Sequence, residues 1–364
     1  MPDVIAGFDI GGTKVSLVVA DPTGEREHHV VEPTETASEL IEYEKAHSTY
    51  FGLSVQLREM LTRALAELGK PRVQAIGIVS AGPIHDGALR SPPNVVPQRL
   101  RETHRDLPRL IPVVEPLRHA FACPVSLLND CNGGVLGEVY YGLGRDVQDK
   151  STLHLAYVTI STGFGAGAWD GGRLVLGKHG NAGEVGHSMA RENGLPCGCG
   201  NRGCVESYAS GAGIVRNAST RLLSADPAQA AASKLTKLLG DAPGDLAAPS
   251  DIERIAARVV PEVVFEAAAE EDPIASCVVE DAIAAAGTGL AVVANAYDPA
   301  IISVGGGIAL AHPELLDPIR EAMLQHIGVA APEVRLTPLG AGVTEAGALA
   351  SAQEIARTER EATP

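Results

Sequence analysis

The sequence predicts an α/β protein built from two similar half-domains. A strand, a glycine turn and a second strand follow one another in residues 4–21, VIAGFDIGGTKVSLVVAD. The pattern returns in residues 155–175, LAYVTISTGFGAGAWDGGRLV, after about 150 residues, which indicates an internal duplication around one cleft. Apolar stripes and runs predict helices at residues 53–68, ended by Gly69, and at residues 282–297.

The charge balance argues against a nucleic-acid partner. The 364 residues are enough for about two domains. They include 45 Asp and Glu residues against 29 Lys and Arg residues, a formal net charge of -16. Because a phosphate backbone needs a basic surface, we expect no nucleic-acid partner.

The cysteines and apolar segments indicate a cytoplasmic protein with no membrane partner. Cys123, Cys131 and Cys277 are scattered singly, as free thiols are in a reducing compartment. The N-terminus, MPDVIAGFDI, lacks the basic and apolar regions of a secretory signal. The uncharged, Ala- and Gly-rich run at residues 282–297 is too short and too weakly apolar to span a bilayer, so it predicts a buried helix.

Residues 9–14, DIGGTK, are the first candidate anion site. Gly11 and Gly12 predict a tight turn between two strands. The backbone N–H groups of such a turn, with the Thr13 hydroxyl and the Lys14 ammonium, can hold phosphate groups. Asp9 could reach a phosphate only through a cation such as Mg²⁺. The alternative is an ordinary hairpin turn without a ligand.

Two further glycine clusters suit the same kind of ligand. Residues 161–165 form the turn of the second strand pair. The glycine spacing there also fits a dinucleotide fingerprint, but residues 169–172 predict a turn where that fingerprint requires a helix. In residues 300–310, AIISVGGGIAL, a strand leads into three glycines that allow close backbone approach to a ligand.

Residues 180–206, GNAGEVGHSMARENGLPCGCGNRGCVE, contain a candidate metal site. One imidazole and three thiols form a Cys3His set of the kind that holds structural zinc: His187, Cys197, Cys199 and Cys204. Glu184 and Glu206 bracket this set. A purely structural metal clip would leave both carboxylates without a role.

Asp130 is the candidate general base. Residues 123–134, CPVSLLNDCNGG, predict a strand that ends at residues 129–130 and a helix from about Asn132. An Asp at such a junction could simply cap the helix. The functional interpretation is that Asp130 deprotonates a hydroxyl that attacks a phosphoryl group.

These motifs together resemble the ROK family of sugar kinases and sugar-responsive repressors, from residue 4 to about residue 350. In order they are DIGGTK at 9–14, ND at 129–130, STGFGAG at 161–167, NAGEVGH at 181–187, CGCGNRGCVE at 197–206 and VGGGI at 304–308. The E-x-G-H motif combined with C-x-C-G-x-x-G-C is the most specific part of the resemblance.

The resemblance implies the actin-like ATPase fold, in which two RNase H-like domains close over a cleft. We expect an N-terminal α/β domain at residues 1–125, completed by a C-terminal helix at about 343–358. A larger α/β domain at residues 126–342 would carry the zinc loop 180–206. The expected cofactors are ATP with Mg²⁺ and a structural Zn²⁺, and the expected assembly is a homodimer or homotetramer.

The family's ligand-binding residues carry over where the motifs match. The implied nucleotide site comprises Asp9, Gly11, Gly12, Thr13, Lys14, Thr162, Gly163, Gly305 and Gly306. The implied hexose site comprises Asn94, Asn129, Asp130, Glu184, His187 and Glu206, with Asp130 as the base. His187 would serve both metal and sugar, because a histidine that ligates through one nitrogen can donate an N–H through the other.

Two segments depart from the family pattern. The stretch after Asn94 is longer than usual and lacks the Trp that often follows that Asn. Residues 217–250, rich in Ala, Asp, Pro and Ser, predict a mobile surface loop between helices.

The resemblance implies an ATP-dependent hexose kinase of carbohydrate metabolism that makes hexose 6-phosphate, with glucose as the favoured substrate and mannose or fructose as further ones. An N-acetylmannosamine or N-acetylglucosamine kinase is the alternative, because the same zinc loop occurs there. A sugar-responsive transcription regulator would need a DNA-reading module of about 60–80 residues before the DIGGT turn. Only eight residues precede Asp9, so we expect an enzyme.

Overall fold

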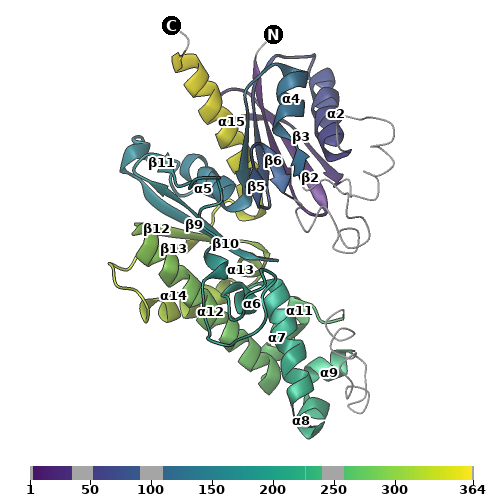
Figure 1. Ribbon diagram of the computed structural model, residues 1–364, viewed down its shortest axis with the longest axis vertical. Helices are drawn as coiled ribbons and strands as arrows, with labels where there is room; N and C mark the ends of the chain where they lie inside the picture. The colour runs from purple at the N-terminus through teal and green to yellow at the C-terminus, as the bar shows by residue number, and fades with distance from the viewer. Residues whose placement is uncertain (1–2, 35–51, 91–109, 226, 240–257, 363–364) are drawn as a thin grey trace. The chain divides into compact units, whose positions relative to one another are not determined.

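The computed structural model describes residues 3–34, 52–90, 110–225, 227–239 and 258–362 (Figure 1). Contacts divide the chain into two compact units. The first comprises Met1–Leu155, Gly167–Ala182 and Thr337–Pro364, and the second comprises Ala156–Ala166 and Gly183–Leu336. The expected boundary at residue 125 divides the chain differently and stays a prediction.

A five-stranded sheet organises the first unit, in the order β3-β2-β1-β4-β8. Its strands are β1 (Val4–Ile10), β2 (Lys14–Ala20), β3 (Arg26–Pro33), β4 (Val73–Ser80) and β8 (Val125–Asn129). β2 is antiparallel to both β1 and β3, whereas β4 is parallel to both β1 and β8. The strand pair predicted around residues 9–14 is therefore confirmed as β1 and β2. A separate small sheet holds β5 (Ile84–His85), β6 (Ala88–Arg90) and β7 (Leu110–Pro112).

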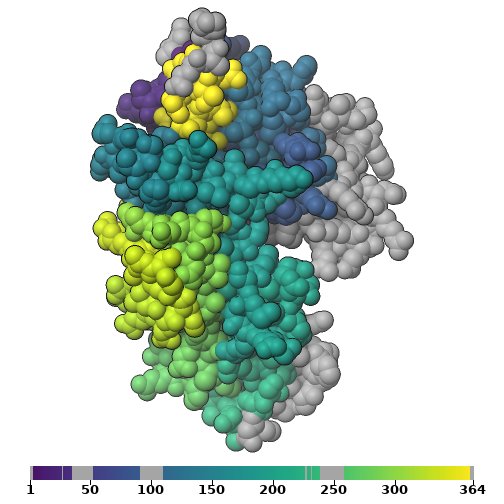
Figure 2. Space-filling model, turned by 60° about the vertical axis from the view of Figure 1, so that its left-hand side comes forward, coloured from purple at the N-terminus to yellow at the C-terminus, as the bar shows by residue number. Residues whose placement is uncertain are grey.

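Helices cover both faces of the first sheet. α2 (Gly52–Glu67) and α4 (Val114–Phe121) share a core with one face, which includes Phe8. α15 (Val343–Ala362) packs on the other face, beside α5 (Asp130–Tyr140). Figure 2 shows α15, in yellow, beside the purple N-terminal segment. Because side chains alternate along β1, Ile5 and Asp9 lie on the α15 side, and this alternation brings Asp9 to the start of that helix.

A second five-stranded sheet has the order β11-β10-β9-β12-β13. Its strands are β9 (His154–Ile160), β10 (Phe164–Asp170), β11 (Arg173–Leu174), β12 (Ile301–Gly305) and β13 (Glu333–Leu336). β9 and β10 confirm the predicted second strand pair, and β12 confirms the predicted strand before the third glycine cluster. The helices of the second unit are α6 (Glu206–Ala209), α7 (Gly211–Ser224), α8 (Pro227–Ala232), α9 (Lys234–Leu239), α11 (Pro261–Ala269), α12 (Pro273–Tyr297), α13 (Gly307–Ala311) and α14 (Leu316–Leu324).

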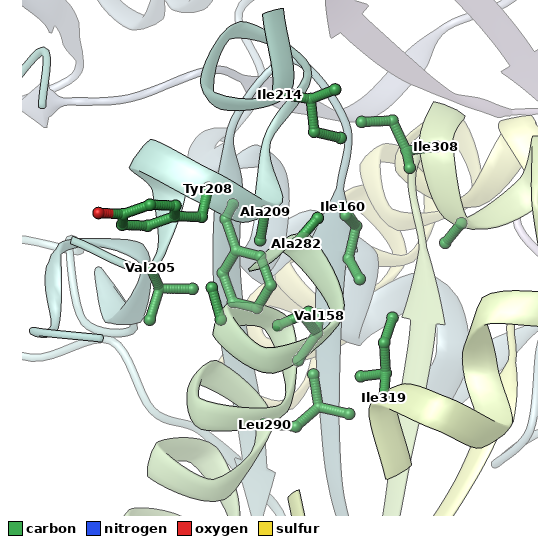
Figure 3. Packing of buried hydrophobic residues seen from close by; sticks show 14 of the residues in the cluster. Val158, Ile160, Val205, Tyr208, Ala209, Ile214, Ala282, Leu290, Ile308 and Ile319 are labelled. Carbon is green, nitrogen blue, oxygen red and sulfur yellow. The ribbon is translucent and has the colours of Figure 1, made fainter. Parts of the chain in front are cut away.

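α12 is the predicted buried helix. It has 25 residues and is capped by Asp272, whose side chain accepts hydrogen bonds from two backbone N–H groups of the first turn. By length and composition alone it could cross a membrane, but 56% of its most apolar window is buried inside the protein. Figure 3 shows Ala282 and Leu290 of this helix among side chains of β9, α6 and α14. α12 is thus a core helix of the second unit.

The prediction of a mobile loop at residues 217–250 is wrong for the part that the structure describes. Residues 217–224 continue α7, and α8 and α9 follow. Leu222 and Leu235 are buried in the core of the second unit, which fixes these helices against it. The polar, Ala-rich composition concealed these apolar anchors. Residues 240–250 lie outside the described part of the chain.

Candidate functional site

We call the glycine turns at residues 9–14 and 161–165 the first and second phosphate turns, after their predicted ligand. The first joins β1 to β2 in the first unit. The N–H of Gly11 donates to the carbonyl of Lys14 at 2.9 Å, which closes the turn. Thr34, directly after β3, stabilises the turn, because its hydroxyl donates to the Gly11 carbonyl at 2.8 Å. The side chains of Thr13 and Lys14 are exposed, so a hydroxyl and an ammonium are free to meet an anion at this turn.

Asp9 lies at the base of this turn. Its Oδ2 accepts a 2.6 Å hydrogen bond from the Thr344 hydroxyl at the start of α15. The pKa of Asp9 is raised from 3.8 to about 6: burial is the largest cause, the Thr344 hydrogen bond acts to lower the pKa, and the carboxylates of Glu345 and Asp130 act to raise it. A carboxylate held among like charges with little hydration suits a cation ligand, and Asp9 can hold Mg²⁺.

Asn129 and Asp130 stand where β8 meets α5, and the helix cap is Asn129. The Asn129 side chain accepts from the Asn132 N–H at 2.8 Å, and its backbone is extended, as an N-cap requires. The alternative in which Asp130 serves as the cap is therefore wrong. Both residue types are good caps, so the sequence did not distinguish them.

Asp130 accepts its hydrogen bonds from the neighbouring Cys131, through the backbone N–H at 2.9 Å and through the thiol. In the described part of the chain, no Lys or Arg forms an ion pair with it. Burial raises its pKa above the ordinary range for Asp. A carboxylate in this state is a better proton acceptor near neutral pH than an exposed one.

The second phosphate turn joins β9 to β10 in the second unit. The Ser161 N–H donates to the Gly163 carbonyl at 2.9 Å, and the Gly211 N–H at the start of α7 donates to the Ser161 carbonyl at 2.8 Å. Thr162, at the tip, is exposed. The turn therefore presents a hydroxyl and backbone to solvent, as an anion site needs.

The third glycine cluster lies next to this turn. β12 ends at Gly305, and Gly306 stands at the N-terminus of α13. Gly306 lies against the backbone carbonyl of Ile160, the last residue of β9. The second unit thus brings Thr162, Gly163, Gly305 and Gly306 into one region, while Asp9, Gly11, Gly12, Thr13 and Lys14 lie together in the first unit.

The predicted metal ligands meet in one cluster, in a segment that we call the metal loop (residues 183–206). The ligand atoms of His187, Cys197, Cys199 and Cys204 all lie within 4.8 Å of one another. A tetrahedral zinc ion with Zn–S distances of about 2.3 Å sets its sulfur ligands about 3.8 Å apart. The Sγ atoms of Cys199 and Cys204 are 3.8 Å apart, and the Cys197 Sγ lies 3.7 Å from the His187 Nδ1. These spacings fit one tetrahedral ion.

The two nitrogens of His187 face different groups. Nδ1 faces the thiols, whereas Nε2 lies 3.8 Å from the Glu184 Oε2. An ion bound through Nδ1 would leave the Nε2 proton directed at groups beside Glu184. Glu206 lies on the other side, with its Oε1 4.0 Å from the His187 Nδ1. Glu184 and Glu206, which a purely structural metal clip would leave without a role, thus each have a carboxylate oxygen within 4.0 Å of a nitrogen of His187.

Asp281 of α12 holds the metal loop in place, and the sequence reasoning missed it. Its carboxylate accepts from Arg191 of the loop at 2.6 Å, from Arg221 at 2.6 Å and from Asn217 at 2.9 Å. Burial acts to raise the pKa of Asp281, but the hydrogen bonds from Arg221, Asn217 and Arg191 hold it below the ordinary range. The Arg191 guanidinium also lies over the Tyr208 ring, 5.0 Å from its centroid. The adjacent Glu280 and Asp281, in an otherwise Ala-rich buried helix, were the signal available in the sequence.

Two hydrogen bonds connect Arg191 and Tyr208 to the segment that carries the cysteines. The Arg191 N–H donates to the Gly203 carbonyl at 3.0 Å, beside Cys204. The Tyr208 hydroxyl accepts from the Leu195 N–H at 2.8 Å, two residues before Cys197. Through Arg191 and Tyr208, Asp281 is therefore connected to both ends of the segment that carries the three cysteines.

One expected site residue cannot be placed. Asn94, expected to bind the sugar, lies outside the described residues, as does most of the long segment after it.

Comparison with known proteins defines the class. The model of the ROK family matches residues 5–359, and the chain belongs to that family. A glucokinase of Streptomyces coelicolor is 32% identical over 322 residues, which cover 87% of this chain and 86% of that enzyme. An N-acetylmannosamine kinase of Escherichia fergusonii is 32% identical over 277 residues, which cover 75% of this chain and 80% of that enzyme.

Solved structures of the same family share the fold. The ROK hexokinase of Thermus thermophilus matches with a TM-score of 0.71 and 28% identity, covering 98% of this chain and 99% of that one. A ROK family glucokinase of Streptomyces griseus, in complex with glucose and AMPPNP, matches with a TM-score of 0.64 and 29% identity, covering 97% and 99%. These likenesses confirm the expected actin-like ATPase fold.

Proposed function

We propose that the protein is an ATP-dependent hexose kinase that phosphorylates the 6-hydroxyl of glucose, with Asp130 as the general base. The state of Asp130 is the observation that carries the proposal: the helix cap is Asn129, and burial raises the pKa of Asp130. The glucokinase and hexokinase relatives support the same activity.

Asp130 takes the proton from the sugar 6-hydroxyl as the oxygen attacks the γ-phosphorus of ATP. The bond from phosphorus to the β,γ-bridging oxygen breaks, and ADP leaves. Phosphoryl transfer depends mainly on positioning and on charge stabilisation. The backbone of the two phosphate turns, with Thr13, Lys14 and Thr162, would bind the phosphates, and Gly305 and Gly306 would lie near the adenosine. Asp9 would hold Mg²⁺, which neutralises phosphate charge when bound.

We assign the sugar hydroxyls to residues that pair with them through amide, carboxylate and imidazole groups: Asn94, Asn129, Asp130, Glu184, His187 and Glu206. Buried hydroxyls must each find a partner, so such groups discriminate strongly among sugars. The orientation of His187, with Nε2 on the side of Glu184, supports its place in this set.

We propose zinc as the occupant of the Cys3His cluster. The sulfur spacing and the donor set suit zinc, and His187, Cys197, Cys199 and Cys204 would hold it. The ion would order the metal loop and fix the tautomer of His187, while the phosphoryl group is transferred elsewhere. The cytoplasmic location and the homodimeric or homotetrameric state stay predictions.

N-acetylmannosamine is the second candidate substrate. The Escherichia fergusonii relative is named N-acetylmannosamine kinase, and its sequence identity to this chain equals that of the Streptomyces coelicolor glucokinase. A panel of glucose, mannose, fructose, N-acetylmannosamine and N-acetylglucosamine, assayed for ADP release with MgATP, separates the two. We expect the highest kcat/KM with glucose. A higher kcat/KM with N-acetylmannosamine would make that sugar the substrate instead of glucose. The absence of turnover with every sugar would contradict the proposed kinase activity.

A further inference from the structure

The metal loop and the second phosphate turn meet at Phe164, the first residue of β10. Its N–H donates to the Glu206 Oε2 at 3.2 Å. Its carbonyl oxygen lies against Gly186, next to the ligand His187, where an added Cβ would be 2.0 Å from that oxygen. The residue that ends the turn is therefore in direct contact with both ends of the metal loop.

Glu206 contacts the metal ligands and the turn at once. Its Oε2 accepts from Phe164, while its Oε1 lies 3.9 Å from the Cys197 Sγ and 4.0 Å from the His187 Nδ1. The two oxygens of a carboxylate move together. A change in the position of the ligands therefore changes the hydrogen bond to the turn.

The backbone around Glu206 is bonded to the same turn. The Ser210 hydroxyl donates to the Glu206 carbonyl at 2.7 Å, which fixes the start of α6. The Gly211 N–H, one residue further, donates to the Ser161 carbonyl at the other end of the turn. A Cβ on Gly163 would lie 3.0 Å from the Glu206 Oε2, a tight contact, so glycine at this position leaves room for the carboxylate.

We propose that Glu206 is a positioning residue that couples metal binding to nucleotide binding. A metal ion in the cluster would fix Cys197 and His187, which lie against the Glu206 Oε1, the carboxylate holds the Phe164 N–H through its Oε2, and the turn at residues 161–165 is set for phosphate before the nucleotide arrives. The identity of the bound anion rests on the proposed function. Because coupling between sites is reciprocal, the nucleotide strengthens metal binding by the same factor by which the metal strengthens nucleotide binding.

The test measures this factor from both directions in the absence of sugar, so the assigned role of Glu206 in sugar binding does not enter. Titration calorimetry gives the Kd of Mg-AMPPNP for the zinc-loaded and the zinc-free protein. Competition with the chromophoric chelator 4-(2-pyridylazo)resorcinol gives the zinc Kd with and without saturating Mg-AMPPNP. If the zinc-free protein does not keep its fold by circular dichroism, the chelator competition alone gives the factor. We expect at least about 5-fold coupling, equal in the two directions.

Three variants separate coupling from simple loss of metal. Glu206→Ala removes the acceptor of the Phe164 N–H, and its coupling factor should fall to about 1. Glu206→Gln keeps an oxygen acceptor and should retain most of the factor. Asp281→Asn loosens the metal loop at Arg191 and leaves the bond from Phe164 to Glu206 in place, so it should weaken zinc binding while leaving the factor unchanged.

The outcomes distinguish the inference from the proposed function. If the wild type binds the nucleotide with a coupling factor of 1, or if Glu206→Ala keeps the wild-type coupling factor, the proposed coupling is overturned. The proposed kinase activity would not be affected by either result. A loss of the factor in Asp281→Asn equal to that in Glu206→Ala would reduce Glu206 to one of several supports of the metal loop. Absence of Mg-AMPPNP binding to the zinc-loaded wild type would overturn both proposals.

Discussion

Thr344 donates a hydrogen bond of 2.6 Å to Asp9, although the two residues are 335 positions apart in the sequence. The bond joins the first turn of α15 to the end of β1. It connects the last helix of the chain to the candidate cation ligand of the first phosphate turn, within one compact unit.

Thr344→Val should weaken Mg-nucleotide binding without removing it. The substitution deletes the hydroxyl that orients Asp9, and the loss of a hydrogen bond to a charged group costs about 1.5–3 kcal/mol. We expect the KM for MgATP to rise about tenfold or more while the KM for glucose changes little. Thr358→Val is the matched control, because Thr358 is an exposed residue of the same helix whose hydroxyl donates to the Glu354 carbonyl within that helix. Equal effects of the two variants would contradict a specific role for Thr344.

Asp9→Asn should stabilise the free protein at neutral pH. The pKa of Asp9 is raised to about 6 in the folded protein, so folding favours its protonated form. The unfolded chain releases this proton near pH 4 and the folded protein near pH 6. The destabilising effect is therefore absent below pH 4 and complete above pH 6, on the order of 1–3 kcal/mol.

Thermal unfolding without Mg²⁺ or nucleotide checks this sign. Asp9→Asn should have a higher unfolding midpoint than the wild type at pH 7.5 and the same midpoint at pH 4. Asp317→Asn, at an exposed carboxylate of α14 paired with Arg320, should show neither effect. A pH-independent difference for Asp9→Asn would show that its carboxylate is not held in an unfavourable charged state. Mg-nucleotide binding to Asp9→Asn should be lost, because the amide cannot replace the anionic ligand.

Cys199→Ser should lose metal and sugar affinity together. The cluster would keep three ligands, and no ion would hold the Nδ1 of His187. The imidazole ring would then no longer be fixed in the orientation that directs its Nε2 N–H at the sugar. We expect less than one equivalent of zinc by plasma emission analysis and at least a tenfold higher glucose Kd, on the order of what loss of an oriented polar partner costs. Cys277→Ser removes a free thiol outside the cluster and should change neither value. Normal glucose binding by metal-free Cys199→Ser would contradict the expected dependence of sugar binding on the metal.

The sequence predicted the local elements well, because their signals are local. Alternating apolar residues around glycine turns predicted β1, β2, β9 and β10, and the 3.6-residue stripe predicted α2 with its end at Gly69. The spacing of His187, Cys197, Cys199 and Cys204 predicted their cluster, because a short glycine-rich loop limits how far its ligands can separate.

Long-range side-chain contacts were not predictable in the same way. The bonds from Thr344 to Asp9, from Arg191 to Asp281 and from Phe164 to Glu206 join residues whose proximity depends on how strands and helices pack. The choice between Asn129 and Asp130 as the helix cap depends on one residue's backbone angles. In residues 217–239, the buried leucines that the structure describes, Leu222 and Leu235, stand far apart in a polar, Ala-rich segment and produce no recognisable pattern.

The most direct test of the central claim compares product formation by the wild type and Asp130→Asn, with glucose binding measured on both. In ³¹P NMR with glucose and MgATP, the wild type should form glucose 6-phosphate and ADP. Asp130→Asn should bind glucose with similar affinity and keep its fold, while kcat falls by a factor of about 10²–10⁴, as loss of a general base predicts. Near-normal turnover by Asp130→Asn would contradict the assignment of Asp130 as the base, and a phosphorylated position other than the 6-hydroxyl would contradict the proposed reaction.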